Sequence, residues 1–275
     1  MVGEFDAVAA GSAHMGMPSV TMHTERFPLA RYGCLLFTYS SIPQVGQTTV
    51  ALLDKYKQFR DEFLPCKVLW YNCVPGDCLL VSTKKPIQTM EDLQGMKVQS
   101  MAAEPIKALK LLGAAPVPIG TADRYSALEI GVIDASMEEW NFTWVWKLHE
   151  VTKYRTDTVE WFRARSYPSL VNPDAYNKLP EDVRRIFDEV TDLKAMTMQI
   201  AQAMVDFNAA SKEKVLEYDK KVGNPPAYYL MEAEVARWKE VTKSVNEDYI
   251  KELEAKGLPG RAFVEDAIAF AKQYK

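Results

Sequence analysis

Apolar and polar positions alternate along the first half of the chain in a way that predicts strands and helices in turn. A helix is predicted over residues 104–112, where apolar residues have helical spacing, and Gly113 ends it. Pro75-Gly76 predicts a turn between two strands. Short apolar runs predict strands at residues 67–71, 78–82, 96–99 and 116–119. This alternation is typical of α/β layers with a largely parallel sheet.

The pattern changes after Pro180. From there to Val222 apolar residues keep helical spacing with no interrupting glycine or proline. We expect one very long helix or two abutting ones, long enough to span two lobes. A last amphipathic helix is predicted from about Glu232 to Ala255, and it ends at the sequence GLPG.

One phrase, Gly-x-x-Asp-Ala, occurs twice, beginning at Gly131 and at Gly3. In the middle copy a short apolar-striped segment precedes Gly131, which ends it as a helix-terminating glycine, and an extended run follows. The first copy has only two residues in front of Gly3. If the two phrases are equivalent, the first lacks its helix, and we interpret the chain as a fragment.

Composition limits the classes of function. The chain has 275 residues, which suggests two lobes, and its 48% hydrophobic and 25% charged residues are typical of a soluble globular protein. A formal charge of −4 gives no basic surface for nucleic acid or an anionic membrane. No apolar run approaches the roughly 20 residues of a membrane span. The N-terminus lacks the charged start of a signal peptide.

Metal chemistry is not indicated. The cysteines form no CxxC motif and, with three histidines, give no zinc spacing. Cys73 and Cys78 could pair in an oxidising compartment, but we favour free thiols because a chain of this length needs no covalent link. The stretch between His14 and His23 is rich in methionine, which suits copper(I), but methionine also fills irregular gaps. We therefore expect no metal site.

Several stretches, in order and with their spacing kept, resemble one family. They are KKPIQTMEDLQGMKVQ, ALKLLGAAPVPI, YSALEIGVIDASMEEW and KLHEVTKY, together with GEFDAVAAG followed by RFPL, NPDAYNKLPEDVRRIFDEV and DYIKELEAKGLPG. The family is that of the DctP-like solute-binding proteins of tripartite ATP-independent periplasmic (TRAP) transporters.

The resemblance implies an α/β fold of two lobes, periplasmic-binding-protein-like with type II topology. Crossing strands and a long helix join the lobes, which close on a ligand. It also implies a strand, a helix and a strand before the first Gly-x-x-Asp phrase, so we expect the first lobe to be incomplete. The expected division assigns residues 1–76 and 164–203 to lobe I, and residues 77–163 and 204–275 to lobe II.

The resemblance also places the ligand site. In this family an arginine that binds a ligand carboxylate is expected after a Leu-x-Gly-x-Lys motif, which is residues 93–97 here, but that position holds Gln99. An asparagine position falls on Glu138, and a further arginine position falls on Cys78 or Leu79. Arg163 and Arg165 lie where the chain should cross back between the lobes, close to the cleft. Either could pair with Glu138 or bind the carboxylate of an organic acid, which is the interpretation we favour, or both could be surface charges on the crossing strand.

Aromatic residues are dense between Trp140 and Leu148. At helical spacing most should be core, and we expect only Trp140 to face the cleft. The residues that we expect to line the ligand site are His14, Asn72, Cys78, Gln99, Glu138, Glu139, Trp140, Arg163 and Arg165.

The implied function is that of a periplasmic protein, a monomer or weak dimer without a cofactor. It would capture a small organic solute, preferably an organic acid, and deliver it to the membrane permease subunits of a TRAP transporter. Two alternatives remain: a periplasmic ligand-sensing module that uses the same cleft, and an enzyme with Glu138 as a base. Adjacent Glu138 and Glu139 would point to opposite faces of a strand, and the chain has no nucleophile motif. We therefore expect no catalytic residue.

Overall fold

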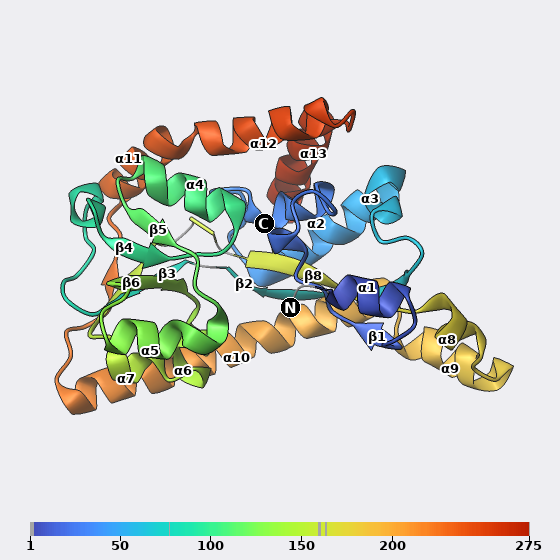
Figure 1. The fold of residues 1–275 in the computed structure, drawn as a ribbon, viewed down its shortest axis with the longest axis horizontal. Coiled ribbons are helices and arrows are strands. Elements are labelled where there is room, and N and C mark those ends of the chain that lie inside the picture. The colour runs from blue at the N-terminus through green and yellow to red at the C-terminus, as the bar shows by residue number, and fades with distance from the viewer. Residues whose placement is uncertain (1–2, 77, 159–160, 163, 275) are drawn as a thin grey trace.

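The structure, a computed structural model, describes residues 3–76, 78–158, 161–162 and 164–274 and has two α/β lobes, each built on one sheet (Figure 1). The first lobe has a three-stranded sheet of order β1-β8-β2, and the second a six-stranded sheet of order β5-β4-β6-β3-β7-β9. The strands are β1 (Met15–Gly16), β2 (Lys67–Pro75), β3 (Leu79–Ser82), β4 (Lys97–Gln99), β5 (Ala115–Val117), β6 (Ala135–Glu138), β7 (Tyr154–Asp157), β8 (Ala164–Val171) and β9 (Tyr228–Tyr229). The two-lobed α/β fold is thereby confirmed.

Helices cover both sheets. The α-helices are α1 (Glu4–Ala9), α2 (Ile42–Lys55), α3 (Lys57–Asp61), α4 (Ala103–Leu111), α5 (Arg124–Glu129), α6 (Trp140–Val145), α7 (Leu148–Val151), α8 (Pro173–Asn177), α9 (Glu181–Val190), α10 (Leu193–Val222), α11 (Glu232–Thr242), α12 (Ser244–Ala255) and α13 (Gly260–Gln273). The 3-10 helices are η1 (Val20–Met22), η2 (Leu29–Cys34), η3 (Met90–Leu93) and η4 (Thr121–Asp123).

The six-stranded sheet is largely parallel, as the alternation of strands and helices predicts. Strand β4 pairs in parallel with β5 and β6, and β7 pairs in parallel with β9. Strand β3 runs antiparallel to both of its neighbours, β6 and β7. The three-stranded sheet differs from the expectation because both of its strand pairs are antiparallel. The reason is that β2 and β8 run in opposite directions: one leaves the first lobe and the other returns to it.

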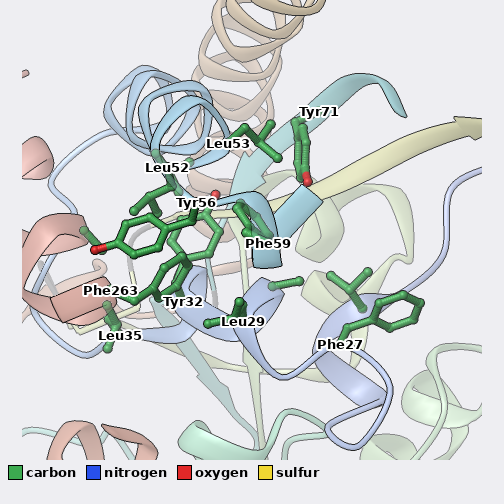
Figure 2. Packing of buried hydrophobic residues seen from close by; sticks show 14 of the residues in the cluster. Phe27, Leu29, Tyr32, Leu35, Leu52, Leu53, Tyr56, Phe59, Tyr71 and Phe263 are labelled. Atoms are coloured by element: carbon green, nitrogen blue, oxygen red, sulfur yellow. The ribbon is translucent and has the colours of Figure 1, made fainter. Parts of the chain in front are cut away.

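Aromatic rings fill the core of the first lobe (Figure 2). The ring of Tyr32 in η2 lies 5.5 Å from that of Phe59 and 6.1 Å from that of Phe263 in α13. Burial of side chains of this size stabilises the fold by about 1.5–3 kcal/mol each. Helix α13 follows the GLPG sequence and had no counterpart among the predicted elements. Its register places apolar residues three or four positions apart on the face that packs into this core.

Two abutting helices occupy the stretch from Pro180 to Val222, one of the two arrangements that the pattern predicts. Helix α9 ends before Thr191, and the side chain of Asp192 caps α10 by accepting a hydrogen bond from the Ala195 amide at 2.7 Å. Helix α10 then runs along both lobes (Figure 1). Its Thr197 Oγ1 accepts a hydrogen bond from the Tyr71 amide of β2, and Val215 packs in a cluster with Leu79 of β3.

The two Gly-x-x-Asp phrases adopt different structures. Gly131 ends α5 with φ +76°, and a strand follows, as predicted. After Gly3 the chain forms helix α1 instead of an extended run. This sequence is rich in alanine, and helical spacing lets Phe5 and Val8 turn together into the first-lobe core, where the ring of Phe5 lies 5.2 Å from that of Phe27.

The region from Glu232 to Ala255 is helical as predicted, in two pieces, α11 and α12. The division of the chain between lobes stays a prediction. Tyr249 of α12 and Phe263 of α13 pack in the core of the first lobe, whereas Trp238 of α11 packs in that of the second.

All four cysteines are buried free thiols, as favoured from the sequence. Within the described ranges, none of the helices combines the length and the apolar character that a bilayer span requires.

Candidate functional site

A cavity of about 540 Å³ lies between the two lobes. The first lobe contributes residues of η1 and the loop before it and of strands β2 and β8. The second lobe contributes the ends of strands β4 and β6, the segment that leads through η4 into α5, helix α6 and the residue that follows α6. The lining residues are Met17, Ser19, Thr21, Met22, Val74, Arg165 and Tyr167 from the first lobe, and Gln99–Ala102, Gly120–Ala122, Arg124, Met137, Phe142 and Trp146 from the second. This volume suits a small organic molecule.

The second-lobe wall of the cavity follows from the sheet. Strands β4, β5 and β6 run parallel, so their carboxyl ends meet at one edge. The residues just beyond those ends line the cavity or support its lining. Ligands of open α/β sheets bind at this edge, because the loops there converge from neighbouring strands.

Arg124 and Glu138 form a buried ion pair in this wall. Arg124 begins α5, and its Nη1 donates hydrogen bonds to both carboxylate oxygens of Glu138, at 3.0 and 3.1 Å. The Glu138 side chain is fully buried at the end of β6, and that of Arg124 is 12% exposed. A buried carboxylate is stable only when paired, so Arg124 compensates the charge of Glu138.

Two further side chains complete this arrangement. The Ser136 hydroxyl lies within hydrogen-bond distance of the Glu138 carboxylate and of Gln99 Oε1, the latter at 2.9 Å. The amide nitrogen of Gln99 donates to the Ile119 carbonyl at 3.0 Å. Gln99 therefore lines the cavity, but its amide group is tied to the protein on both sides.

A second buried ion pair joins the lobes. Arg165 of β8 donates from Nη2 to Glu139, which precedes α6. The side chains are 13% and 1% exposed. Because β8 belongs to the first-lobe sheet and α6 packs in the second lobe, this pair holds the two walls of the cavity together.

The structure brings together some of the residues expected from the sequence. Gln99 and Arg165 line the cavity, and Glu138 and Glu139 lie behind it as partners of its arginines. Arg163 lies outside the described residues. Arg165, one of the two arginines named as possible partners of Glu138, pairs with Glu139. Glu138 pairs with Arg124, and its pairing with Arg163 stays a prediction.

Other expected residues lie elsewhere. The Asn72 side chain donates to the Tyr167 carbonyl and to Ser169 Oγ within the first-lobe sheet. Cys78 and Trp140 line a separate cavity of about 270 Å³ beside α10. His14 is exposed, and its carbonyl accepts a hydrogen bond from the Asn172 amide.

The aromatic residues that line the cavity from this segment do not include Trp140, the one expected from the sequence. Trp140 is buried in a cluster with α10, whereas Phe142 and Trp146 line the cavity. Residues four apart share one face of a helix, and a residue two positions away points to nearly the opposite side. Arg124 was also missed. Its place directly after a predicted strand and loop, at the carboxyl edge of the sheet, was the signal that could have revealed it.

The cavity combines an apolar enclosure with two arginines, each of which is paired with a glutamate. The lining surface is mainly apolar and includes four methionines and three aromatic residues, and its cations are arginines, which match carboxylates in geometry. Across the described part of the chain, no three His, Cys, Asp or Glu side chains are grouped as metal ligands.

Comparison with solved structures shows the same fold. A TRAP solute-binding protein from Rhodoferax ferrireducens, in complex with copurified benzoate, matches with a TM-score of 0.88 at 22% identity over 99% of this chain and 83% of that one. A marine metagenome TRAP solute-binding protein specific for aromatic acid ligands, in complex with metahydroxyphenylacetate, matches with a TM-score of 0.89 at 24% identity over 99% and 84%.

Sequence comparison agrees with this result. The chain is similar to the C4-dicarboxylate-binding periplasmic protein DctP of Rhodobacter capsulatus, at 25% identity over 262 residues, which is 93% of this chain and 74% of that protein. The family model for DctP, bacterial extracellular solute-binding protein family 7, matches residues 2–253. The chain therefore belongs to bacterial extracellular solute-binding protein family 7, the family of the TRAP solute-binding proteins.

Proposed function

We propose that this protein captures a small organic acid with an apolar, preferably aromatic, body in the cavity between its lobes and delivers it to a TRAP permease. The observation that carries the proposal is the combination of Arg124 and Arg165 with an otherwise largely apolar lining. Arginine binds a carboxylate, and the aromatic and methionine surface buries the rest of the molecule.

The aromatic lining favours an aromatic acid over a small dicarboxylate. Phe142 of α6 and Trp146, which directly follows this helix, line the cavity from the second lobe, and Tyr167 lines it from the first. Aromatic rings packed against each other contribute about 0.5–1.5 kcal/mol beyond the area they bury. The benzoate and metahydroxyphenylacetate complexes of the structural relatives support this choice.

The delivery step rests on the family. We infer that the protein works in the periplasm, binds its ligand by closure of the two lobes, and releases it unchanged to the permease. The ion pair between Arg165 and Glu139 joins the lobes beside the cavity, so it would form on closure and break on opening. No cofactor is needed for this cycle.

The experiment is to identify and then measure the ligand. Protein purified from its natural host is denatured, and the released small molecules are identified by mass spectrometry. Isothermal titration with benzoate, 3-hydroxybenzoate, mandelate, succinate and glucuronate then ranks the classes. We expect an aromatic acid to bind most tightly and to be recovered unchanged. Tighter binding of a sugar acid or a dicarboxylate would overturn the aromatic preference, and chemical conversion would overturn the binding-only role.

A further inference from the structure

We propose that Arg124, at the start of α5, holds the carboxylate of the bound acid through the Nε–Nη2 edge of its guanidinium, and that Glu138, Ser136 and Gln99 position it for this task. This inference rests on the proposed function and names the residue that sets its preference for an acid.

The hydrogen-bond donors of Arg124 divide into two groups. Nη1 is used by the protein, since it donates to both oxygens of Glu138. Nε is buried without a partner, and Nη2 makes no hydrogen bond to any residue that the structure describes. A buried donor without an acceptor is unfavourable, so this edge requires a partner from outside the chain.

The shape of the free edge selects the partner. The Nε and Nη2 hydrogens of an arginine point in parallel and fit the two oxygens of one carboxylate. Arg124 lines the cavity between the lobes, so an acid inside it can reach this edge. A neutral amide offers only one acceptor oxygen and no charge, and it should bind less tightly.

Glu138 fixes the direction of Arg124. Its carboxylate is fully buried, and because it takes both hydrogen bonds from Nη1 it leaves the opposite edge of the guanidinium free. Ser136 contacts this carboxylate and Gln99 Oε1, and Gln99 is held by the Ile119 carbonyl. The chain of contacts runs from β4 through β6 to α5, so the orientation of Arg124 is set by the sheet.

Arg165 has a different role in this proposal. Its Nη2 is bound to Glu139 in the other lobe, so we assign it to holding the lobes closed. Substitution of Arg165 should therefore weaken the binding of acids and of their neutral analogues to the same extent. Substitution of Arg124 should weaken the binding of the acids alone.

The test compares three acids with their amides: benzoate, phenylacetate and mandelate against benzamide, phenylacetamide and mandelamide. Titration calorimetry is carried out on the full chain, on Arg124→Lys, on Arg165→Lys and on Arg185→Lys. Lysine keeps the charge but cannot form the two parallel bonds. Arg185 is a matched control, because it forms an exposed ion pair with Glu189 on α9, away from the cavity.

We expect Arg124→Lys to weaken acid binding roughly 10- to 100-fold and to leave amide binding unchanged, as the loss of a charged hydrogen bond predicts. Arg185→Lys should match the unsubstituted protein. Two outcomes would overturn the assignment and leave the proposed function intact. In the first, Arg124→Lys weakens the binding of acids and of amides equally. In the second, Arg124→Lys still binds the acids, whereas Arg165→Lys loses acid binding and keeps amide binding. If the unsubstituted protein binds none of the three acids, both the assignment of Arg124 and the proposed function are overturned.

A second variant covers the case in which Arg124→Lys does not fold, which circular dichroism would reveal. In Glu138→Gln the amide oxygen still accepts from Nη1, while a negative charge beside the bound acid is removed. We expect several-fold tighter binding of the acids and unchanged binding of the amides. Weaker binding of acids in this variant would contradict the proposal.

Discussion

Arg31 of the first lobe and Glu104 of the second form an ion pair that is almost completely buried, with side chains 2% and 1% exposed. Arg31 Nε donates to Glu104 Oε1 at 3.1 Å, and its Nη2 also donates to Glu252 of α12 at 2.9 Å. Burial by itself would lower the pKa of Arg31, but Glu104 raises it above its usual value, so Arg31 stays charged. Glu104 lies in the first turn of α4, just after the loop that lines the cavity, so the pair joins the lobes beside the cavity.

Glu104→Gln should lower the free energy of unfolding by about 3 kcal/mol, because it leaves the buried charge of Arg31 with a weaker partner. Chemical denaturation measures this change. The control is Glu247→Gln, which breaks an exposed ion pair with Arg261 and should cost less than about 1 kcal/mol. Equal effects of the two substitutions would contradict the structural importance of the buried pair.

The stability of the protein should fall as the pH rises from about 4.5 to about 8, because of Glu62. Burial raises the pKa of its carboxyl to about 8, although the amides of Leu29 and Ala30 donate to it. The folded state therefore holds a proton that the unfolded state releases near pH 4.5. Glu62 contributes a slope of at most about 1.4 kcal/mol per pH unit between these values.

Denaturation at pH 5, 6.5 and 8 measures this slope in the unsubstituted protein and in Glu62→Gln. The substitution should flatten the dependence and leave stability at pH 5 nearly unchanged. A slope that persists in Glu62→Gln would show that another group is responsible.

Phe263→Ala should destabilise the first lobe by about 3–5 kcal/mol. The ring is completely buried and lies 5.0 Å from that of Tyr56 and 5.7 Å from that of Phe59, so truncation leaves a cavity between α13 and the rest of the core. Thermal or chemical unfolding gives the value. Phe207→Ala on α10, where the ring is 43% exposed, is the matched control and should change stability by about 0.5 kcal/mol or less.

Trp146→Leu should weaken the binding of benzoate or mandelate roughly 3- to 10-fold, since it removes one ring from the cavity wall but keeps an apolar side chain. Binding of succinate should change less, because that acid has no ring to stack. Trp70→Leu, on β2 and outside the cavity lining, should leave all three affinities unchanged. If both tryptophan substitutions have the same effect, Trp146 makes no specific contact with the ring.

Local sequence determined most of the elements. Strands such as β2 and β4, the helix that Gly113 ends, and the break-free apolar spacing of α10 all follow from patterns within a few residues of each other. The family was also visible in the sequence, because its phrases are distributed in order along the chain. The first Gly-x-x-Asp phrase shows the limit of such reasoning, since its residues suit a strand or a helix and packing against Phe27 accompanies the helix.

The site depended on tertiary structure. Gln99, Glu138 and Arg165, which were expected at the ligand site from the sequence, lie in or directly behind the cavity lining. The sequence could not pair the charged residues, because a buried charge takes whichever partner the fold brings within reach. Arg124 lies 14 residues from Glu138 along the chain and Arg165 lies 26 residues from Glu139. The meeting of parallel strand ends at one edge, and of two lobes across one cavity, decided which arginine pairs with which glutamate and which arginines line the cavity.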